Sequence, residues 1–165
     1  MRQRVGIESL AVAVPHRYLD IEDLAKARGV DPARIVASGR QNFADYFAAI
    51  GNLDVALDTI PYNGATTTLD TLWMGTPLVA LKGDRAVARG AYSILSSLEL
   101  SELIADTPEA YVDINVRLAR DYEWRSRLRS SLRERLAASP LMDADTFVAD
   151  LETCYRAMWR SWCRQ

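Results

Sequence analysis

The chain has 165 residues, of which 49% are hydrophobic and 25% charged, the length and composition of a single globular domain. A net charge of −2 excludes the strongly basic surface that attracts nucleic acid or anionic membranes. No apolar run approaches a membrane span, and Glu8 and Ser9 break the short apolar run at the N-terminus. We therefore expect a cytoplasmic protein with no signal peptide, no membrane partner and no nucleic-acid partner.

Few side chains are available for redox or metal chemistry. Cys154 and Cys163 lie nine positions apart on one predicted helix, about 13 Å along its axis, which is too far for a disulfide. We expect reduced thiols, as in the cytosol. The single histidine, His16, has no ligand cluster near it in the sequence, so we expect a surface histidine, no metal site and no cofactor.

Short apolar runs alternate with helical patterns along the first two thirds of the chain. This alternation predicts an α/β fold, a doubly wound parallel sheet with helices on both faces. The chain opens with a strand-like run, a break at Pro15 and a helix from about Asp20 to Arg28. The predicted strands that follow are 34–39, 54–58, 77–81 and 102–105. The predicted helices between them are 42–52, a helix led by three threonines, and 86–98.

From Pro108 onward, every segment has a helical pattern. The first of these segments carry many arginines with acidic residues between them, a pattern that fits either a phosphate-binding stripe or a solvated face. Opposed charges along a helix favour the solvated face. The last helix spaces large side chains along one stripe that requires a partner: Phe147, Leu151, Tyr155, Met158 and Trp162.

The sequence PYNGATTTLDTLWMGTP, residues 61–77, contains the candidate binding site. In an open α/β sheet, ligands bind outside the carboxyl ends of the strands, where helices begin. Asn63 and Gly64 permit a tight turn there, and the small Ala65 leaves room above it. Thr66 and Thr67 offer backbone N–H groups and hydroxyls at a helix N-terminus, which suits an anion such as a diphosphate.

Two interpretations of this turn remain open on spacing alone. In the first, Asp70 lies one turn into the helix and reaches the ribose hydroxyls of a nucleotide whose phosphates rest on the turn. In the second, Thr67 and Asp70 have the spacing of a capping box, which satisfies the helix start without any ligand.

A family resemblance favours the nucleotide site. The segment LDTIPYNGATTTLDTLWMGTPLVAL resembles the nucleotide-sugar-binding segment of SPINDLY-like O-linked N-acetylglucosamine transferases. The likeness extends over roughly residues 34–162 and includes ELSELIADTPEAYVDINVRLARD and LRERLAASPLMDADTFVADLETCYRAMW. The resemblance implies a Rossmann-like C-terminal domain of a GT-B glycosyltransferase, the fold with two such domains and a UDP-sugar in the cleft between them.

The resemblance also implies roles for particular residues. Thr66 and Thr67 would contact the pyrophosphate and Asp70 the ribose, so that the threonines form a phosphate cradle that also caps a helix. Tyr46 and the backbone of Gln41 would face the uracil. Gly64 and Ala65 complete the UDP-sugar contacts, and no catalytic residue is carried over. Such enzymes invert at the sugar carbon, transfer N-acetylglucosamine (GlcNAc) to Ser or Thr hydroxyls of proteins and need no metal.

The chain departs from the family pattern at several positions. Many members have histidines where this chain has Ala65 and Tyr46, and the animal-type motif has a lysine near the position of Phe43. A complete enzyme also brings a first Rossmann domain, a phosphate-binding lysine and the acceptor groove, which do not fit into the residues before 34. We therefore expect this chain alone to be weakly active or inactive.

The segment VGIESLAVAVPHRYLDIEDLAKARGVDP resembles the start of hydroxymethylglutaryl-CoA synthase-type, thiolase-fold proteins. We therefore expect residues 1–33 to be a strand–helix segment of different origin, joined near residues 30–34 to a nucleotide-sugar-binding domain over 34–165. Chance similarity of a short unit is the alternative. An acyl-CoA condensing enzyme is disfavoured, because its reactive cysteine would have to be Cys154 or Cys163 at the far end of the chain.

Two functions of different classes follow from the sequence. The first is the UDP-GlcNAc-binding half of a protein O-GlcNAc transferase, whose partners are the UDP-sugar, an acceptor protein and the missing domain. The second is a non-catalytic interaction module that pairs with itself through the aromatic stripe of the last helix.

Overall fold

The computed structural model describes residues 25–36 and 38–164. The chain divides into two compact units at the boundary between Arg40 and Gln41. In the first unit, residues 25–27 are helical and a 3₁₀ turn, η1 (Pro32–Arg34), follows with Asp31 as its N-cap. The predicted origin of residues 1–33 lies largely outside the described residues and stays a prediction.

The predicted strand at 34–39 is wrong for the residues that the structure describes. Ile35 and Val36 are irregular, as are residues 38–40, and the Val36 side chain is 89% exposed. A strand is stabilised by a neighbouring strand and one buried face. In the described part of the chain the sheet consists of other segments, and residues 35, 36 and 38–40 are all exposed.

The second unit is built on a parallel sheet of three short strands. These are β1 (Ala56–Leu57), β2 (Leu78–Leu81) and β3 (Ile104–Ala105), in the order β1-β2-β3. Ala56 pairs with Leu78, and Leu81 pairs with Ala105. Each strand lies inside a predicted one and begins later than predicted, so the parallel α/β prediction is confirmed.

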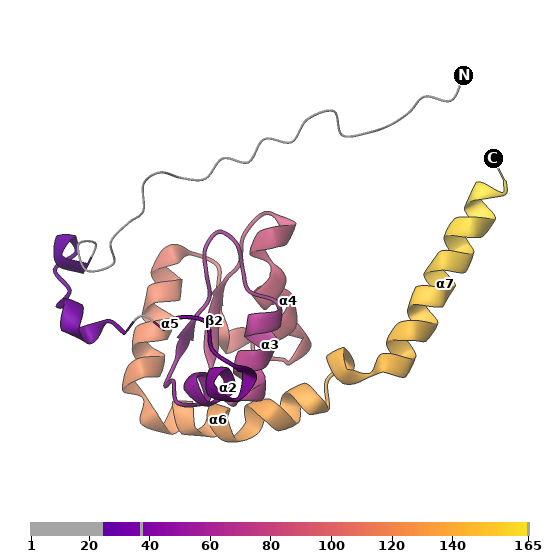
Figure 1. The fold of residues 1–165 in the computed structure, drawn as a ribbon. Coiled ribbons are helices and arrows are strands. Elements are labelled where there is room, and N and C mark those ends of the chain that lie inside the picture. Colours follow the sequence, from indigo (N-terminus) through magenta and orange to yellow (C-terminus); the bar gives the residue numbers. More distant parts are fainter. Residues whose placement is uncertain (1–24, 37, 165) are drawn as a thin grey trace. The chain divides into compact units, whose positions relative to one another are not determined.

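Helices cover both faces of the sheet (Figure 1). Strand β2 contacts α5 (Pro108–Arg120) on one face. It contacts α3 (Thr66–Trp73) and α4 (Gly90–Ser97) on the other. The short 3₁₀ turns η2 (Ala86–Ala88) and η3 (Ser101–Leu103) lie at the two ends of α4 along the chain. The core between these layers is aliphatic, and its fully buried side chains include Leu72, Val79, Leu95, Leu100, Leu103, Leu118 and Leu132.

Two further helices frame this core. Helix α2 (Phe43–Gly51) begins at Asn42, whose side chain accepts a hydrogen bond from the Asp45 N–H. Helix α6 (Tyr122–Ala137) begins at Asp121, whose side chain accepts from the Trp124 N–H. Both N-caps are the residue types that satisfy the free N–H groups of a helix start. Helix α6 buries Leu128, Leu132 and Leu136 on one stripe, as its pattern predicts.

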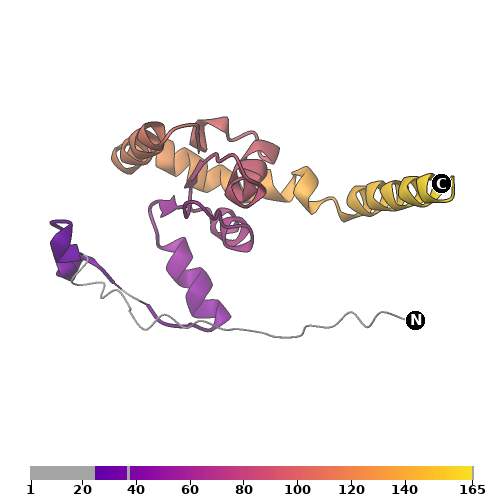
Figure 2. The ribbon, with the colours of Figure 1, turned by 90° about the horizontal axis from the view of Figure 1, so that it is seen from above.

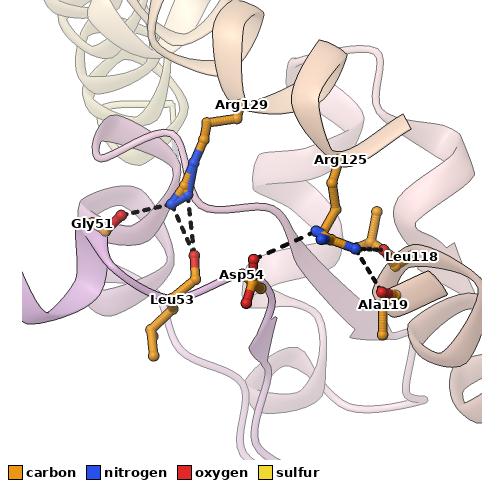
Figure 3. A network of polar contacts seen from close by, with 7 residues as sticks. All are labelled: Gly51, Leu53, Asp54, Leu118, Ala119, Arg125 and Arg129. Carbon is orange, nitrogen blue, oxygen red and sulfur yellow. Dashed lines mark hydrogen bonds and ion pairs between the residues drawn. The ribbon is translucent and has the colours of Figure 1, made fainter. Parts of the chain in front are cut away.

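Three arginines of α6, four residues apart, bind the C-terminal ends of three other helices. Arg129 donates to the Gly51 carbonyl at 2.6 Å and to the Leu53 carbonyl at 2.9 and 3.1 Å, at the end of α2 (Figure 3). Arg125 donates to the carbonyls of Leu118 and Ala119 near the end of α5. Arg133 donates to the Trp73 carbonyl at the end of α3.

These contacts correct the prediction that the arginines form a solvated face. The last carbonyls of a helix lack intrahelical partners and carry partial negative charge, so cations bind well there. Because residues four apart share one helix face, this arginine row holds three helix ends against α6.

The turn from α3 into β2 is equally constrained. The N–H of Thr76 bonds to the Thr71 carbonyl and the N–H of Gly75 to the Leu72 carbonyl, both at 3.0 Å, which is the Schellman pattern. Gly75 has a φ of +78°, and a Cβ there would lie 2.9 Å from the Arg129 carbonyl oxygen. Only glycine fits at this close approach.

The chain ends in η4 (Pro140–Met142) and α7 (Ala144–Trp162). Every residue of α7 is exposed, and the second view shows no other helix beside it (Figure 2). Both cysteines are free, as predicted. None of the helices in the described residues is long and apolar enough to span a bilayer.

Candidate functional site

The carboxyl edge of the sheet collects polar residues directly after each strand. Asp58 follows β1, Lys82 follows β2 and Asp106 follows β3. The Lys82 Nζ lies 3.2 Å from Asp106 Oδ1. Because the strands are parallel, the loop from β1 to α3 lies at this same edge, where ligands of open α/β sheets bind.

Helix α3 begins at this edge without a side-chain cap. Ala65 occupies the N-cap position and makes no side-chain hydrogen bond, and the helix starts at Thr66. The capping-box interpretation is therefore wrong, because it requires Thr67 rather than Ala65 at the N-cap. Ala65, Thr66 and Thr67 are all exposed, so the first turn of α3 presents its backbone and two hydroxyls at the surface.

The third threonine has a different task. Thr68 is buried, and its hydroxyl donates to the Gly64 carbonyl at 3.1 Å. Thr71, one turn further on, is also buried and donates to the Thr67 carbonyl at 2.6 Å. Bonding to the carbonyl four residues back satisfies a buried threonine hydroxyl inside a helix. The three threonines thus divide into an exposed pair and one that packs the turn against the core.

The structure joins two predicted site residues that are 24 positions apart in the sequence. The Tyr46 hydroxyl of α2 donates to Asp70 Oδ2 of α3 at 3.1 Å, and both side chains are partly buried. Gln41 lies in the exposed segment just before α2. Gly64 is half-buried and joins the loop to Ala65. The predicted site therefore consists of two parts. One is the turn at residues 64–67, and the other is the hydrogen-bonded pair of Tyr46 on α2 and Asp70 on α3.

The loop that carries this turn is held by a residue that sequence reasoning missed. Asp58 is only 6% exposed, and its Oδ1 accepts a hydrogen bond from the Gly64 N–H at 2.9 Å. Burial raises the pKa of Asp58, while the N–H groups of Gly64 and Thr59 act against that rise. The Tyr111 hydroxyl donates to the Asp58 backbone carbonyl at 3.0 Å. An acidic residue directly after a strand, eight positions before Thr66, was the available signal.

Because of Tyr46 and Tyr111, we expect the free energy of unfolding to fall at high pH. Burial, and then the carboxylate of Asp70, raise the pKa of Tyr46, and burial followed by the charge of Asp58 raises the pKa of Tyr111. The stability that these phenols contribute is complete below the unfolded pKa of about 10. It is lost as the pH rises through the higher native pKa, because the unfolded chain releases its protons first.

We therefore expect the free energy of unfolding of Tyr46→Phe to fall less steeply above about pH 10 than that of the unsubstituted chain. Denaturant titrations at a series of pH values measure this slope. Tyr62→Phe, at an exposed side chain, is the matched control for the loss of a phenol. An unaltered slope in Tyr46→Phe would contradict the role assigned to the pair with Asp70.

Comparison with solved structures establishes the class of fold. A mutant O-GlcNAc transferase of Thermobaculum terrenum superposes with a TM-score of 0.81 at 40% sequence identity, over 87% of this chain and 28% of that chain. This confirms the predicted fold, the α/β domain of a GT-B glycosyltransferase.

Comparison with sequences gives the family. The model of glycosyl transferase family 41 matches residues 15–151, and the chain belongs to that family. The Petunia hybrida protein named probable UDP-N-acetylglucosamine–peptide N-acetylglucosaminyltransferase SPINDLY is 41% identical over 119 residues, which are 72% of this chain and 13% of that protein. A Caenorhabditis elegans UDP-N-acetylglucosamine–peptide N-acetylglucosaminyltransferase is 36% identical over 133 residues, 81% of this chain and 12% of that protein. The chain thus spans about an eighth of these relatives.

Proposed function

We propose that this chain is the UDP-GlcNAc-binding half of a cytoplasmic protein O-GlcNAc transferase. The observation that carries the proposal is the uncapped, exposed start of α3 at the carboxyl edge of the sheet, beside the Tyr46–Asp70 pair. The relatives named above are transferases whose names include UDP-N-acetylglucosamine.

Each part of a UDP-sugar has a matching group at this site. The N–H groups and hydroxyls of Thr66 and Thr67 donate to the diphosphate, whose charge is favoured at a helix N-terminus. Asp70 accepts hydrogen bonds from the ribose hydroxyls with the carboxylate oxygen that Tyr46 leaves available. The Tyr46 ring and the backbone of Gln41 face the uracil. GlcNAc passes, with inversion at the sugar carbon, to a Ser or Thr hydroxyl. UDP is the leaving group, and it stays bound to this domain as the bond to the sugar breaks.

The remaining steps of the transfer need groups outside this chain. The proposed site binds and orients the donor, and no residue of the chain is proposed as the general base, so the base and the acceptor groove belong to the other domain of the enzyme. We propose that the reaction uses no metal and that the chain alone is weakly active or inactive.

Thr67→Ala tests the phosphate contact. Removing a hydroxyl that donates to a charged phosphate costs about 1.5–3 kcal/mol, which is roughly a tenfold to hundredfold rise in the Kd for UDP. Calorimetric titration of UDP measures the change. Thr153→Ala, at an exposed position of α7, is the matched control and should bind like the unsubstituted chain. Equal UDP affinities in all three proteins would contradict the assignment.

A second candidate function is a self-associating module, and the exposed face of α7 favours it. Val148, Leu151, Tyr155, Met158 and Trp162 are all more than a third exposed, and their alternating spacing of three and four residues is that of a coiled-coil seam. A seam of this kind, without a covering element in the described residues, indicates a partner helix.

The order of charges along α7 indicates that the partner is a second copy in the antiparallel direction. The acidic residues near its start are Asp143, Asp145, Asp150 and Glu152, and the basic residues near its end are Arg156, Arg160 and Arg164. Antiparallel pairing places the acidic half of one helix opposite the basic half of the other, whereas parallel pairing brings like charges together.

The two cysteines test this arrangement. Cys154 lies at the middle of α7 and Cys163 at its end. In an antiparallel pair the two Cys154 residues meet, whereas the two Cys163 residues lie about 30 Å apart along the axis. A short bismaleimide should therefore cross-link the Cys163→Ser variant into covalent dimers and leave the Cys154→Ser variant without a cross-link. Efficient cross-linking of Cys154→Ser would indicate parallel pairing, and a strictly monomeric chain at high micromolar concentration would refute self-association.

A further inference from the structure

A buried carboxylate lies directly behind the exposed threonine turn. Asp58 Oδ1 accepts the Gly64 N–H at 2.9 Å, while its Oδ2 is buried without a hydrogen-bond partner in the described residues. Burying a charged group that is not fully paired is unfavourable. Such a residue reduces stability at neutral pH, so its presence calls for a role other than stabilising the fold.

The peptide that Asp58 holds is fixed from its other sides as well. A Cβ on Gly64 would lie 2.5 Å from Thr67 Oγ1 and 3.0 Å from Thr68 Oγ1. A Cβ on Gly90, at the start of α4, would lie 3.1 Å from the Gly64 carbonyl oxygen. Close packing thus surrounds Gly64 and its carbonyl. Its N–H lies on the other side, in the preceding peptide unit, and is held by the acceptor oxygen of Asp58 directly before the first turn of α3.

The neighbouring residue anchors the same loop to its surroundings. The Asn63 N–H donates to the Val87 carbonyl at 2.9 Å, and its side-chain Nδ2 donates to the Thr59 carbonyl at 3.2 Å. Tyr111 of α5 donates to the Asp58 carbonyl. The loop is thus bound to α5, to η2 and to itself, and Asp58 is its one charged link to the start of α3.

We propose that Asp58 is a positioning residue, whose carboxylate fixes the Gly64 peptide and thereby orients the Thr66–Thr67 turn for the diphosphate. This inference rests on the proposed nucleotide site. Asp58 itself does not contact the ligand, and its effect is confined to the phosphate end of the site. Uridine, which lacks the diphosphate, depends on the Tyr46–Asp70 end and is insensitive to Asp58.

The test compares UDP with uridine in three proteins. Asp58→Ala removes the acceptor and should raise the Kd for UDP about tenfold while leaving the Kd for uridine unchanged. Asp58→Asn keeps an acceptor oxygen without the charge, so its UDP affinity should lie between the two, with a melting temperature equal to or above that of the unsubstituted chain. Asp54→Asn, at the other end of β1 beside Arg125, is the matched control and should change neither Kd.

The outcomes separate this inference from the function on which it rests. If the unsubstituted chain binds UDP but Asp58→Ala binds it equally well, or loses UDP and uridine in the same proportion, Asp58 does not position the turn. If Asp58→Ala does not fold, Asp58→Asn decides, because an unchanged ratio of UDP to uridine affinity would overturn the inference. If the unsubstituted chain binds no UDP, the proposed function and this inference both fail.

Discussion

Gly64→Ala is expected to abolish UDP binding and to lower the stability of the fold. The new Cβ would lie 2.5 Å from Thr67 Oγ1 and 3.0 Å from Thr68 Oγ1, so both hydroxyls and the first turn of α3 must move. Overpacking of this kind costs about 1–3 kcal/mol, equivalent to a fall in the melting temperature of roughly 2–12 °C. Thermal unfolding and calorimetric titration of UDP measure the two effects.

Gly39→Ala is the matched control for this prediction. A Cβ on Gly39 meets nothing within 4 Å, so the substitution should be neutral or slightly stabilising through the unfolded state. A Gly64→Ala protein with the stability and UDP affinity of Gly39→Ala would contradict the tight turn described here.

Arg129→Ala is expected to destabilise the fold by about 1.5–3 kcal/mol, the worth of hydrogen bonds from a charged donor. The guanidinium makes three hydrogen bonds to the carbonyls of Gly51 and Leu53, and their loss leaves the C-terminal end of α2 without its partner. Helix α2 also carries Tyr46, so we expect the pairing with Asp70 to weaken as the end of the helix loosens. Denaturant unfolding measures the first effect.

Arg127→Ala, on the same helix, controls for the loss of an arginine. Its side chain is 67% exposed and lies 3.9 Å from Glu123, an exposed pair worth about 0–1 kcal/mol. We expect Arg127→Ala to change stability by less than about 0.5 kcal/mol. If the two variants are equally stable, the contacts of Arg129 with the end of α2 contribute little.

Most strands and helices were predictable because each is defined by residues that are close together in the sequence. The runs that became β1, β2 and β3 are short, apolar and bounded by turn residues, and the helices follow apolar periodicity. The strand predicted at Ile35 and Val36 was wrong because pairing with a neighbouring strand depends on the tertiary fold. The capping box was wrong for a related reason. The loop ends at Gly64, whose N–H bonds to Asp58, so α3 begins two residues earlier than a capping box at Thr67 requires and Ala65 is its N-cap.

The residues proposed for the site were named from the sequence, but the contacts among them were not. The residues of the turn from Gly64 to Thr67 are consecutive in the sequence. Asp70 was suggested by its position one turn into the predicted helix, and the family resemblance added Tyr46. Their hydrogen bond depends on how α2 packs on α3, which periodicity does not define. The carbonyls that Arg129 and Arg133 bind are also distant in the sequence. For this reason the charge pattern of α6 alone suggested a solvated face.

The most direct test of the proposed nucleotide site is calorimetric titration of UDP into the purified chain, with the Asp70→Ala and Asp113→Ala variants measured in the same way. Asp113 is an exposed residue of α5, far from Asp70 in the sequence. We predict that the unsubstituted chain and Asp113→Ala bind UDP with the same Kd, and that Asp70→Ala loses at least about tenfold in affinity. UDP binding that survives unchanged in a folded Asp70→Ala, or no binding in any of the three folded proteins, would contradict this prediction.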